Sequence, residues 1–455
     1  MKKRKRKKIN MLDGNLLENI ILFALPVIAS GIMQLLFNAI DMVVVGKFSG
    51  NNSMAAVSST GALINLVVNM FIGLSIGSSV CIARRIGSGN NKKVHDAVQT
   101  SVTIALFAGV VLTILGVQFS RPLLVMMKSP DDVIDLSTVY LRVYFTGMLA
   151  TMVYNFASAA LRARGDTKNP LYALIIAGIT NALLNLFFVI EFKMDVAGVG
   201  LASSLSSYIS AGIVLYVLIN DNSSVKLDIR HLYIDKDALW EISKVGIPAG
   251  IQGTVFSLSN VAIQSSVNEF GAVTMAGNGA ASSIEGFVYN AMSAFYQTCL
   301  TFTSQNLGAG KVSRIRKILF VCEACVLVTG LICGVGGYLF GRPLLSIYSD
   351  DPQVIAAGMI RLTFVCRLYF LCGMMDVLVG SLRGMGQSMF PMVVSLVGVC
   401  VFRLVWIATY FQAHQNIESL YVSYPLSWVI TGVIHLLSFI LVYSSVQKKR
   451  KLQLT

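Results

Sequence analysis

The stretch Ser120-Arg-Pro-Leu-Leu124 returns later in the chain as Gly341-Arg-Pro-Leu-Leu345, at an offset of 221 in the residue numbers. Leu161-Arg-Ala-Arg-Gly165 returns as Leu382-Arg-Gly-Met-Gly386 at the same offset. Proline kinks a helix and removes a backbone hydrogen bond, so its placement is costly and informative. The chain is therefore two copies of about 220 residues. Eight of the nine prolines form pairs at an offset of 221 or 222: 26/248, 122/343, 130/352 and 170/391.

The composition indicates that both copies lie in a membrane. The 455 residues are 55% hydrophobic and 13% charged, whereas soluble globular proteins carry about 25% charged residues. A soluble enzyme, a disordered chain and a secreted disulfide scaffold are excluded, and the eight cysteines are expected to be apolar packing residues. Helices satisfy their own backbone in lipid. Apolar runs of spanning length lie at about 18–46, 55–82, 95–118, 134–160, 170–191, 196–219, 241–268, 275–303, 315–340, 354–380, 391–412 and 419–445.

We therefore predict an all-α polytopic membrane protein with twelve transmembrane helices in two pseudo-symmetric six-helix lobes. Because six is even, the two lobes are parallel repeats, an architecture that recurs in secondary transporters. Lys and Arg are concentrated in alternate connections, 27 against 5, which predicts a cell membrane protein with both termini in the cytoplasm. The predicted parts are a basic tail, an N-lobe, a linker, a C-lobe and a second basic tail, at 1–14, 15–220, 221–240, 241–445 and 446–455.

The energy source and the partners follow from the same features. The sequence has no Walker A motif and no channel filter motif, so transport draws on an ion gradient or is passive. We expect no cofactor and a monomer. Membrane lipids are expected partners of the basic ends. Nucleic acid is not expected, because no aromatic residues are interleaved with the basic ones.

Asp41 is the strongest functional candidate. A charge in the bilayer centre costs about 2.5–3.5 kcal/mol, so ionisable residues within spans indicate function by default. Asp41 lies in the first span, with Gln34 two helical turns earlier on a similar face, and could hold a proton or a small cation. The alternative is a helix-terminal aspartate close to water and paired with Lys47. The second copy has Ile263 in place of Asp41, so this chemistry is confined to the first half.

Asn181 and Asn185 lie four residues apart in the fifth span and share a helix face. Their amides could complete a cation cage with Asp41, or hydrogen-bond its protonated form. Alternatively, they hold helices together, at about 0.6 kcal/mol each. Ser203 of the sixth span is a weaker member of the same ion-coupling set. Asp41, Asn181 and Asn185 are thus a candidate Na⁺ site.

The second half carries further ionisable residues within its spans. Arg403 and Asp376 lie on successive spans and could pair, although Asp376 is close enough to the cytoplasmic end to be an interface charge. Glu285, Glu323 and His435 have no partner visible in the sequence. For His435, a hydrogen-bonded core residue is favoured over a proton relay. The residues predicted to line the substrate cleft are Gln34, Asn38, Asn155, Gln252, Asn260, Asp376 and Arg403.

Several motifs resemble one known family. Leu25-Pro26 opening the first span, followed by Asp41-Met-Val-Val-Val-Gly46, resembles the start of the multidrug and toxic compound extrusion (MATE) transporters. The resemblance covers nearly the whole chain, and the order of its motifs makes it specific. The supporting stretches are 83–89, 161–166 with Pro170, 181–185, 198–203, 246–248 and 305–310.

The resemblance implies two six-helix lobes that form a V and export organic cations and other drugs in exchange for Na⁺ or H⁺. In some members the N-lobe ion site consists of residues that correspond to Asp41, Asn181, Asn185 and Ser203. Two positions depart from that pattern, because Asn185 replaces an Asp and Ser203 replaces a Thr. Phe256 stands about where many members carry an acidic residue. With one carboxylate rather than two, the coupling ion stays open between H⁺ and Na⁺.

The sequence therefore predicts a secondary active multidrug efflux transporter, not an enzyme, that exports amphipathic and often cationic compounds in antiport with H⁺ or Na⁺. One alternative is a flippase for lipid-linked saccharides from the related superfamily. Such a cleft would carry several arginines, whereas Arg403 alone is clearly deep here. A membrane sensor or scaffold is a further alternative, but the short loops leave no recognition domain.

Overall fold

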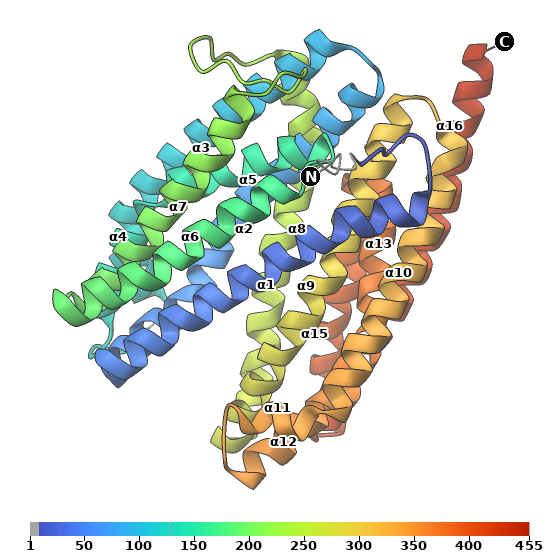
Figure 1. Ribbon diagram of the computed structural model, residues 1–455. Coiled ribbons are helices and arrows are strands. Elements are labelled where there is room, and N and C mark those ends of the chain that lie inside the picture. The colour runs from blue at the N-terminus through green and yellow to red at the C-terminus, as the bar shows by residue number, and fades with distance from the viewer. Residues whose placement is uncertain (1–8, 128, 455) are drawn as a thin grey trace, which may run out of the picture. The chain divides into compact units, whose positions relative to one another are not determined.

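All the regular secondary structure in the part of the chain that the structure describes is helical. The computed structural model describes residues 9–127 and 129–454 (Figure 1). The basic residues 1–8, predicted to belong to a cytoplasmic tail, lie outside the described residues. The chain divides into two units, of which one contains Ala29–Gly250 and the other contains Ile9–Ile28 and the residues after Gly250. The helices α1 (Leu16–Phe48) and α8 (Lys236–Asn268) each contribute to both units.

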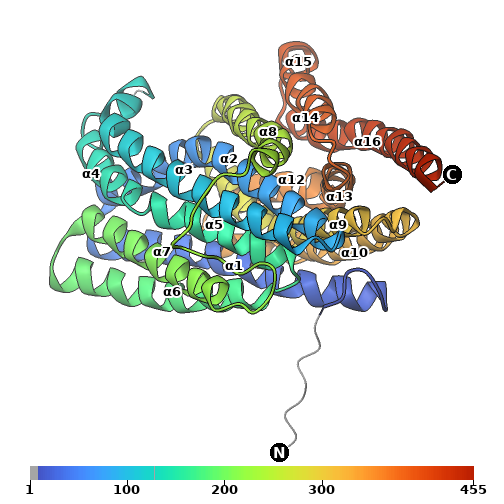
Figure 2. The ribbon, with the colours of Figure 1, turned by 90° about the horizontal axis from the view of Figure 1, so that it is seen from above.

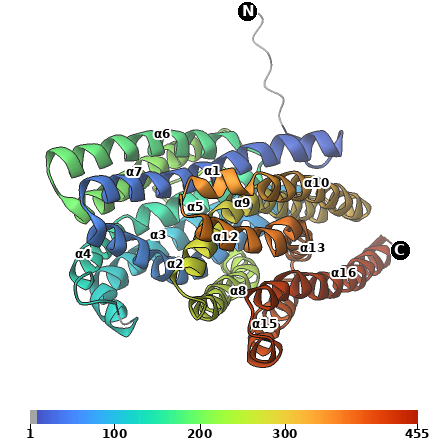
Figure 3. The same cartoon turned by 90° about the horizontal axis from the view of Figure 1, so that it is seen from below.

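The first unit holds the remaining helices of the N-terminal copy. Helices α6 and α7 run side by side along most of their length (Figures 1 and 3). Helices α4 and α5 form one span that bends by 46°. The elements are α2 (Asn51–Gly87), α3 (Asn91–Met126), α4 (Ile134–Phe145), α5 (Met148–Ala163), α6 (Lys168–Leu186), the π-helix η1 (Phe187–Glu191) and α7 (Asp195–Ile219).

The second unit holds the helices of the C-terminal copy. Helices α9, α10 and α13 lie side by side (Figure 2). The elements are α9 (Ala272–Gly308), α10 (Val312–Leu339), α11 (Gly341–Ser346), α12 (Pro352–Phe364), the 3₁₀ turn η2 (Cys366–Leu368), α13 (Phe370–Gly384), α14 (Met389–Ser395), the π-helix η3 (Leu396–Val401), α15 (Phe402–Trp406), the π-helix η4 (Ile407–Phe411) and α16 (Ile417–Leu454).

Backbone geometry repeats with the sequence. Left-handed glycines occur at 50, 89 and 165 with φ of 92°, 72° and 95°, and again at 271, 310 and 386 with φ of 88°, 71° and 86°. Only glycine adopts this region without strain, so these glycines end or begin helices at matching points of the two copies. The bent pair formed by α4 and α5 also has a counterpart, because the span from α12 to α13 bends by 41°. The predicted duplication is therefore present in the backbone.

The predicted spans coincide with long helices. Within the described residues, eight helices are long and apolar enough to cross a membrane, and the two bent pairs raise this number to ten. Helices α8 and α9, of 33 and 37 residues, are long enough as well. They occupy the positions of α1 and α2 in the repeat, which completes the twelve predicted segments.

The predicted linker at 221–240 stays a prediction. Residues 220–235 are not helical and α8 begins at Lys236, while the division between the two units falls at Gly250 inside α8 and after Ile28 inside α1. The second basic tail was predicted at 446–455, and the helix α16 continues through this segment to Leu454. Hydrophobic runs in the sequence do not reveal where a continuous helix passes from one packing unit to another.

Candidate functional site

Asp41 is buried and hydrogen-bonded to two other helices. It lies on α1 with 7% of its surface exposed. The Asn185 amide of α6 donates to Oδ1 at 2.5 Å, and the Ser203 hydroxyl of α7 donates to Oδ2 at 2.9 Å. Lys47, the partner expected for a surface aspartate, is exposed. Neutral donors compensate the buried carboxylate, so the interpretation of Asp41 as a helix-terminal residue close to water does not hold.

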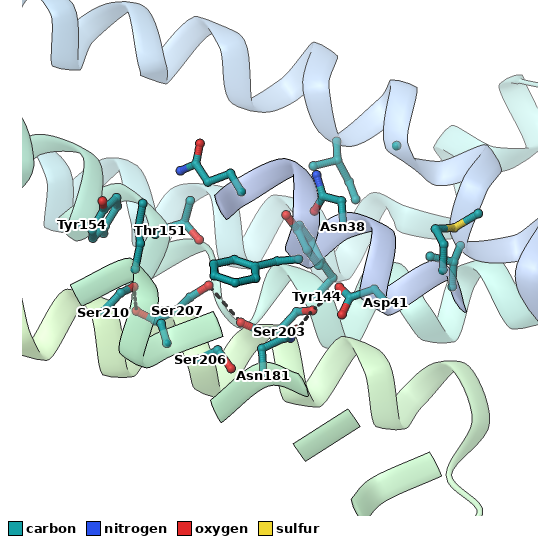
Figure 4. A pocket seen from close by; sticks show the side chains of 18 of the residues that line it. Asn38, Asp41, Tyr144, Thr151, Tyr154, Asn181, Ser203, Ser206, Ser207 and Ser210 are labelled. Carbon is teal, nitrogen blue, oxygen red and sulfur yellow. Dashed lines mark hydrogen bonds between the residues drawn. The ribbon is translucent and has the colours of Figure 1, made fainter. Parts of the chain in front are cut away.

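Asn181 completes the arrangement. Its amide nitrogen donates to Ser203 Oγ at 3.3 Å, and its amide oxygen accepts from Asn185 at 3.2 Å. Asn185 is fully buried, and its Oδ1 has no hydrogen-bond partner among the described residues. The structure thus brings together all four residues predicted for ion coupling, and Figure 4 shows three of them converging. Their oxygens offer a place for a proton or for a small cation such as Na⁺.

A close approach between α1 and α6 holds Asp41 beside Asn185. Gly178 lies two turns before Asn185 on α6, and a Cβ atom at this position would overlap the ring of Phe37. Phe37 lies one turn before Asp41 on α1. Small residues let membrane helices approach closely, because van der Waals packing drives helix association in lipid. The Gly178–Phe37 contact therefore positions the carboxylate against its amide donor.

Asp41 opens into a cavity within the first unit. The cavity has a volume of about 460 Å³ and is lined by side chains from α1, α2, α4, α5, α6 and α7 (Figure 4). Three residues predicted for the substrate cleft, Gln34, Asn38 and Asn155, line it. Serine hydroxyls and amides supply most of its polar groups, and the volume is in the range of small-molecule sites.

The charge and aromatic content of this cavity are distinctive. Among its described lining residues, Asp41 is the one acidic side chain, and none is Lys, Arg or His. Tyr140 and Tyr144 of α4 lie one turn apart, with ring centroids separated by 5.7 Å, and Tyr154 of α5 also lines the cavity. A carboxylate beside aromatic faces attracts a cation that carries an apolar body. Sequence reasoning missed these tyrosines, although the four-residue spacing of Tyr140 and Tyr144 indicates a shared face.

Four residues predicted for the cleft belong to the second unit and do not line the Asp41 cavity. The Gln252 side chain accepts a hydrogen bond from Arg383 at 2.8 Å. Asn260 is exposed on α8. Asp376 lies beside the Tyr289 hydroxyl.

Arg403, the fourth of these residues, does not pair with Asp376. Its Nε donates to Ser427 Oγ of α16 at 3.0 Å, and its guanidinium lies over the ring of Tyr424. No salt bridge joins Arg403 to Asp376 among the described residues. The possible pairing with Asp376 is therefore not seen, and α16 supplies the hydrogen bond and the two rings that contact Arg403.

The second unit contains a buried ion pair that sequence reasoning did not find. Arg361 of α12 donates to both carboxylate oxygens of Glu285 on α9, at 3.0 and 2.7 Å, and Glu285 is 3% exposed. The remaining terminal nitrogen of Arg361 donates to Asn278 Oδ1 at 2.7 Å. The same oxygen accepts a hydrogen bond from the Tyr421 hydroxyl at 2.9 Å. This bidentate pair is fully compensated. The sequence shows Glu285 and Arg361 each inside an apolar run, but nothing in the sequence pairs them.

Glu323 and His435, the two remaining ionisable residues without a partner visible in the sequence, stand apart from this pair. Neither carboxylate oxygen of Glu323 on α10 has a hydrogen-bond partner among the described residues. His435 of α16 is fully buried, and its Nε2 lies 3.0 Å from the Ser395 hydroxyl of α14. This geometry is that of a hydrogen-bonded core histidine.

Comparisons with known proteins agree with one another. The MatE family model matches residues 26–187 and 248–409. A probable multidrug resistance protein of Bacillus subtilis, YoeA, is 27% identical over 90% of both chains. The FAD transporter of Shewanella oneidensis is 24% identical over 89% of this chain and 90% of its own. A solved MOP superfamily transporter from Pyrococcus furiosus superposes with a TM-score of 0.90 at 19% identity, over 98% of this chain and all of its own.

These matches confirm two predictions. The family model matches the chain twice, and both the starts and the ends of the two matches differ by an offset of 222, so the duplication predicted from the prolines is confirmed. Together with the apolar helices, the matches show an all-α, multi-pass membrane protein with two six-helix halves. They also show that the chain is related to transporters and not to enzymes.

Proposed function

Because the chain belongs to the multidrug and toxic compound extrusion family, we propose that it exports amphipathic, often cationic small molecules across the cell membrane in antiport with H⁺ or Na⁺. The observation that carries this proposal is the buried carboxylate of Asp41 at the end of a 460 Å³ cavity. The proposal includes a monomer without a cofactor other than the ion. The imbalance of 27 to 5 basic residues supports cytoplasmic termini.

Coupling requires that the ion bind the two transport states with different affinity, since equal affinity shifts no equilibrium. Asp41 joins α1 to both α6 and α7 through hydrogen bonds that only a deprotonated carboxylate accepts at both oxygens. A proton or Na⁺ bound there changes the hydrogen bonds among three helices. We infer that this change favours the state that releases the substrate outside.

The names of the relatives support a small-molecule substrate. The Bacillus subtilis relative is named a probable multidrug resistance protein, and the Shewanella oneidensis relative is named an FAD transporter. The carboxylate and tyrosines of the cavity favour a cationic amphipath for this chain. They disfavour a flippase for lipid-linked saccharides, because the described lining offers no basic group for a phosphate.

The test is gradient-driven transport of the cationic dye rhodamine 123 in everted vesicles. We expect Asp41→Asn to abolish dye accumulation driven by either ion gradient, and the purified variant to bind the cationic dye more weakly because the carboxylate is lost. The matched control is Asp135→Asn, which neutralises an exposed carboxylate paired with Arg121 at the start of α4. It should transport normally. Full gradient-driven transport by Asp41→Asn would sink the coupling role.

The same vesicles identify the ion. Transport that is driven by a pH gradient without Na⁺ indicates H⁺, and transport that needs a Na⁺ gradient at equal pH indicates Na⁺. Removal of a Na⁺ ligand by Ser203→Ala should then raise the Na⁺ concentration for half-maximal transport by about tenfold. A proton needs only the carboxylate, so this variant should leave H⁺-driven transport within about twofold.

A further inference from the structure

Arg403 is a buried charge with an incomplete set of partners. It lies on α15, between the π-helices η3 and η4, and is 4% exposed. A cation within a membrane span is unfavourable and is expected to have a partner. Short π-helical segments inside helices occur frequently at functional sites. Its position and its charge therefore both require an explanation.

The contacts of Arg403 satisfy only part of the guanidinium. Nε donates to Ser427 Oγ at 3.0 Å, and the guanidinium carbon lies 4.1 Å from the ring centroid of Tyr424 and 5.7 Å from that of Trp428. One terminal nitrogen is buried and has no hydrogen-bond partner among the described residues. A buried donor that lacks an acceptor is unfavourable, and more so when it is charged.

The neighbours of Arg403 do not include an acid. The ionisable side chains close to it are Tyr424, Tyr369, Cys372 and Cys400. Two carboxylates of the unit are engaged elsewhere, since Glu285 binds Arg361 and Asp376 lies beside Tyr289. The guanidinium thus lies among aromatic rings and hydroxyls with no counter-charge from the described residues.

The internal repeat gives this position a meaning. The two matches of the family model have an offset of 222, which places Arg403 at the position of Asn181, and Ile263 at that of Asp41. At the proline pair 170/391 the offset is still 221. The second copy therefore holds one more residue than the first between this pair and Arg403, and the π-helix η3, which lies between Pro391 and Arg403, accommodates that residue. Arg403 therefore occupies the counterpart of a residue in the Asp41 site.

The residues around Arg403 are counterparts of the same site. At an offset of 221, Tyr424 and Ser427 correspond to Ser203 and Ser206, and both serines line the cavity of the first unit. Ser206 and Ser427 are each buried on their helix, which supports this register. In the second half, aromatic rings and a guanidinium thus stand where the first half has hydroxyls, amides and a carboxylate.

We propose that Arg403 binds the anionic group, a carboxylate or phosphate, of transported aromatic compounds, beside the rings of Tyr424 and Trp428 that hold its guanidinium. The free guanidinium nitrogen donates to the oxyanion, and the charge of the ligand compensates the buried cation. This inference rests on the proposed function and extends its substrate class to zwitterionic and anionic amphipaths.

The test uses two dyes that differ by one methyl ester. Rhodamine 110 carries a free carboxylate, and rhodamine 123 is its methyl ester. Their binding to the purified, detergent-solubilised protein is measured by fluorescence anisotropy. We expect Arg403→Met to weaken rhodamine 110 binding by at least about tenfold and rhodamine 123 binding by no more than about twofold. Retained rhodamine 123 binding also shows that the variant is folded.

Two further variants sharpen the result. Arg403→Lys keeps the charge but loses the planar donor set, so its affinity for rhodamine 110 should lie between those of the wild type and Arg403→Met. Arg342→Met removes an exposed arginine of α11 and should change neither dye. Equal weakening of both dyes by Arg403→Met, no weakening of either, or a wild type that does not bind rhodamine 110 overturns the proposal.

The source of the anion is identified in nanodiscs. If phosphatidylglycerol weakens rhodamine 110 binding to the wild type but not to Arg403→Met, a lipid phosphate occupies the site in the membrane. If the lipid has no effect, the occupant is the free compound. Both results support an anion site at Arg403. The ratio of dye affinities does not depend on Asp41 or on an ion gradient, so failure of this inference and failure of the proposed antiport are distinguishable.

Discussion

Equivalent positions in the two halves of this protein carry opposite chemistry. In the first half, Asp41 is a buried carboxylate that accepts hydrogen bonds from an amide and a hydroxyl. In the second half, its counterpart Ile263 is a buried core residue, and Arg403 supplies a buried cation beside aromatic rings. The duplicated scaffold therefore holds an acceptor site in one half and a donor site in the other.

The difference shows which features the repeat constrains. The backbone of the two copies agrees at the left-handed glycines and at the bent spans, because these positions determine helix ends and directions. The side chains that face buried polar sites do not agree. Fold and chemistry are thus separable within one chain, as they are between proteins that share a fold.

The second half also contains a buried carboxylate whose charge is balanced by an arginine of the same half. Glu285 corresponds to Ile64 at the offset of 221 that holds for the glycine pairs on either side. The apolar position in the first half has therefore become one member of a buried ion pair with Arg361 in the second. The first-half carboxylate has only neutral partners, so it is available to an ion, whereas Glu285 is not.

The largest expected effect on stability comes from breaking this pair. Arg361→Met leaves Glu285 buried without its cation, so we expect the free energy of unfolding to fall by about 3–5 kcal/mol. The measurement is thermal unfolding of the detergent-solubilised protein. The matched control, Glu285→Leu with Arg361→Met, removes both charges and should recover most of the loss. A double variant as unstable as the single one would show that packing, and not the unpaired charge, causes the effect.

A smaller effect is expected where α1 meets α6. Gly178→Ala forces the Phe37 ring away and separates Asp41 from Asn185, so gradient-driven dye transport should fall by about tenfold while stability changes by about 1–3 kcal/mol. Gly212→Ala on α7 is the matched control, because a Cβ atom there meets nothing within 4 Å. Phe37→Leu should partly rescue Gly178→Ala. Normal transport by Gly178→Ala would contradict a positioning role for this contact.

Features that depend on residues close together in the sequence were predicted, whereas contacts between residues far apart in the sequence were not. The proline pairs and apolar runs are local signals, and they predicted both the duplication and the helical segments. The four-residue spacing of Asn181 and Asn185 predicted only a shared helix face. Their assignment to one site with Asp41 was implied by the resemblance to the MATE family, because spacing on one helix does not show which helix it faces.

Contacts between distant helices were not predictable in this way. Arg361 and Glu285 are 76 residues apart and belong to helices whose relative rotation the sequence does not encode locally. The same limitation left the partners of Arg403 open, since neighbouring helices need not place given side chains face to face. Its aromatic partners come from α16, and hydrophobic runs do not show which face of α16 meets α15.

The smallest expected effect concerns two N-cap positions that correspond in the repeat. Asn90 caps α3 by accepting from the Lys93 amide at 3.1 Å, whereas its counterpart Lys311, which begins α10, reaches Asp13 at 2.5 Å. The hydrogen bond from the Lys311 ammonium lowers the pKa of Asp13. A lowered pKa in the folded state gives stability that is present above the unfolded value of about 3.9 and is lost as pH falls through the folded value.

Asp13→Asn should therefore lower the Tm by about 1–2 °C at pH 7, because the pair is exposed and screened. The Tm difference from the wild type should shrink as pH falls below the unfolded value of about 3.9 and disappear once pH is below the lowered folded value. Lys311→Met should reproduce the loss at pH 7, and the double variant should add nothing to it, since either change removes the same bond. A Tm difference that persists unchanged at pH 3 would mean that Asp13 acts through its backbone turn, and the charge contrast between the two N-caps would then have no effect on stability.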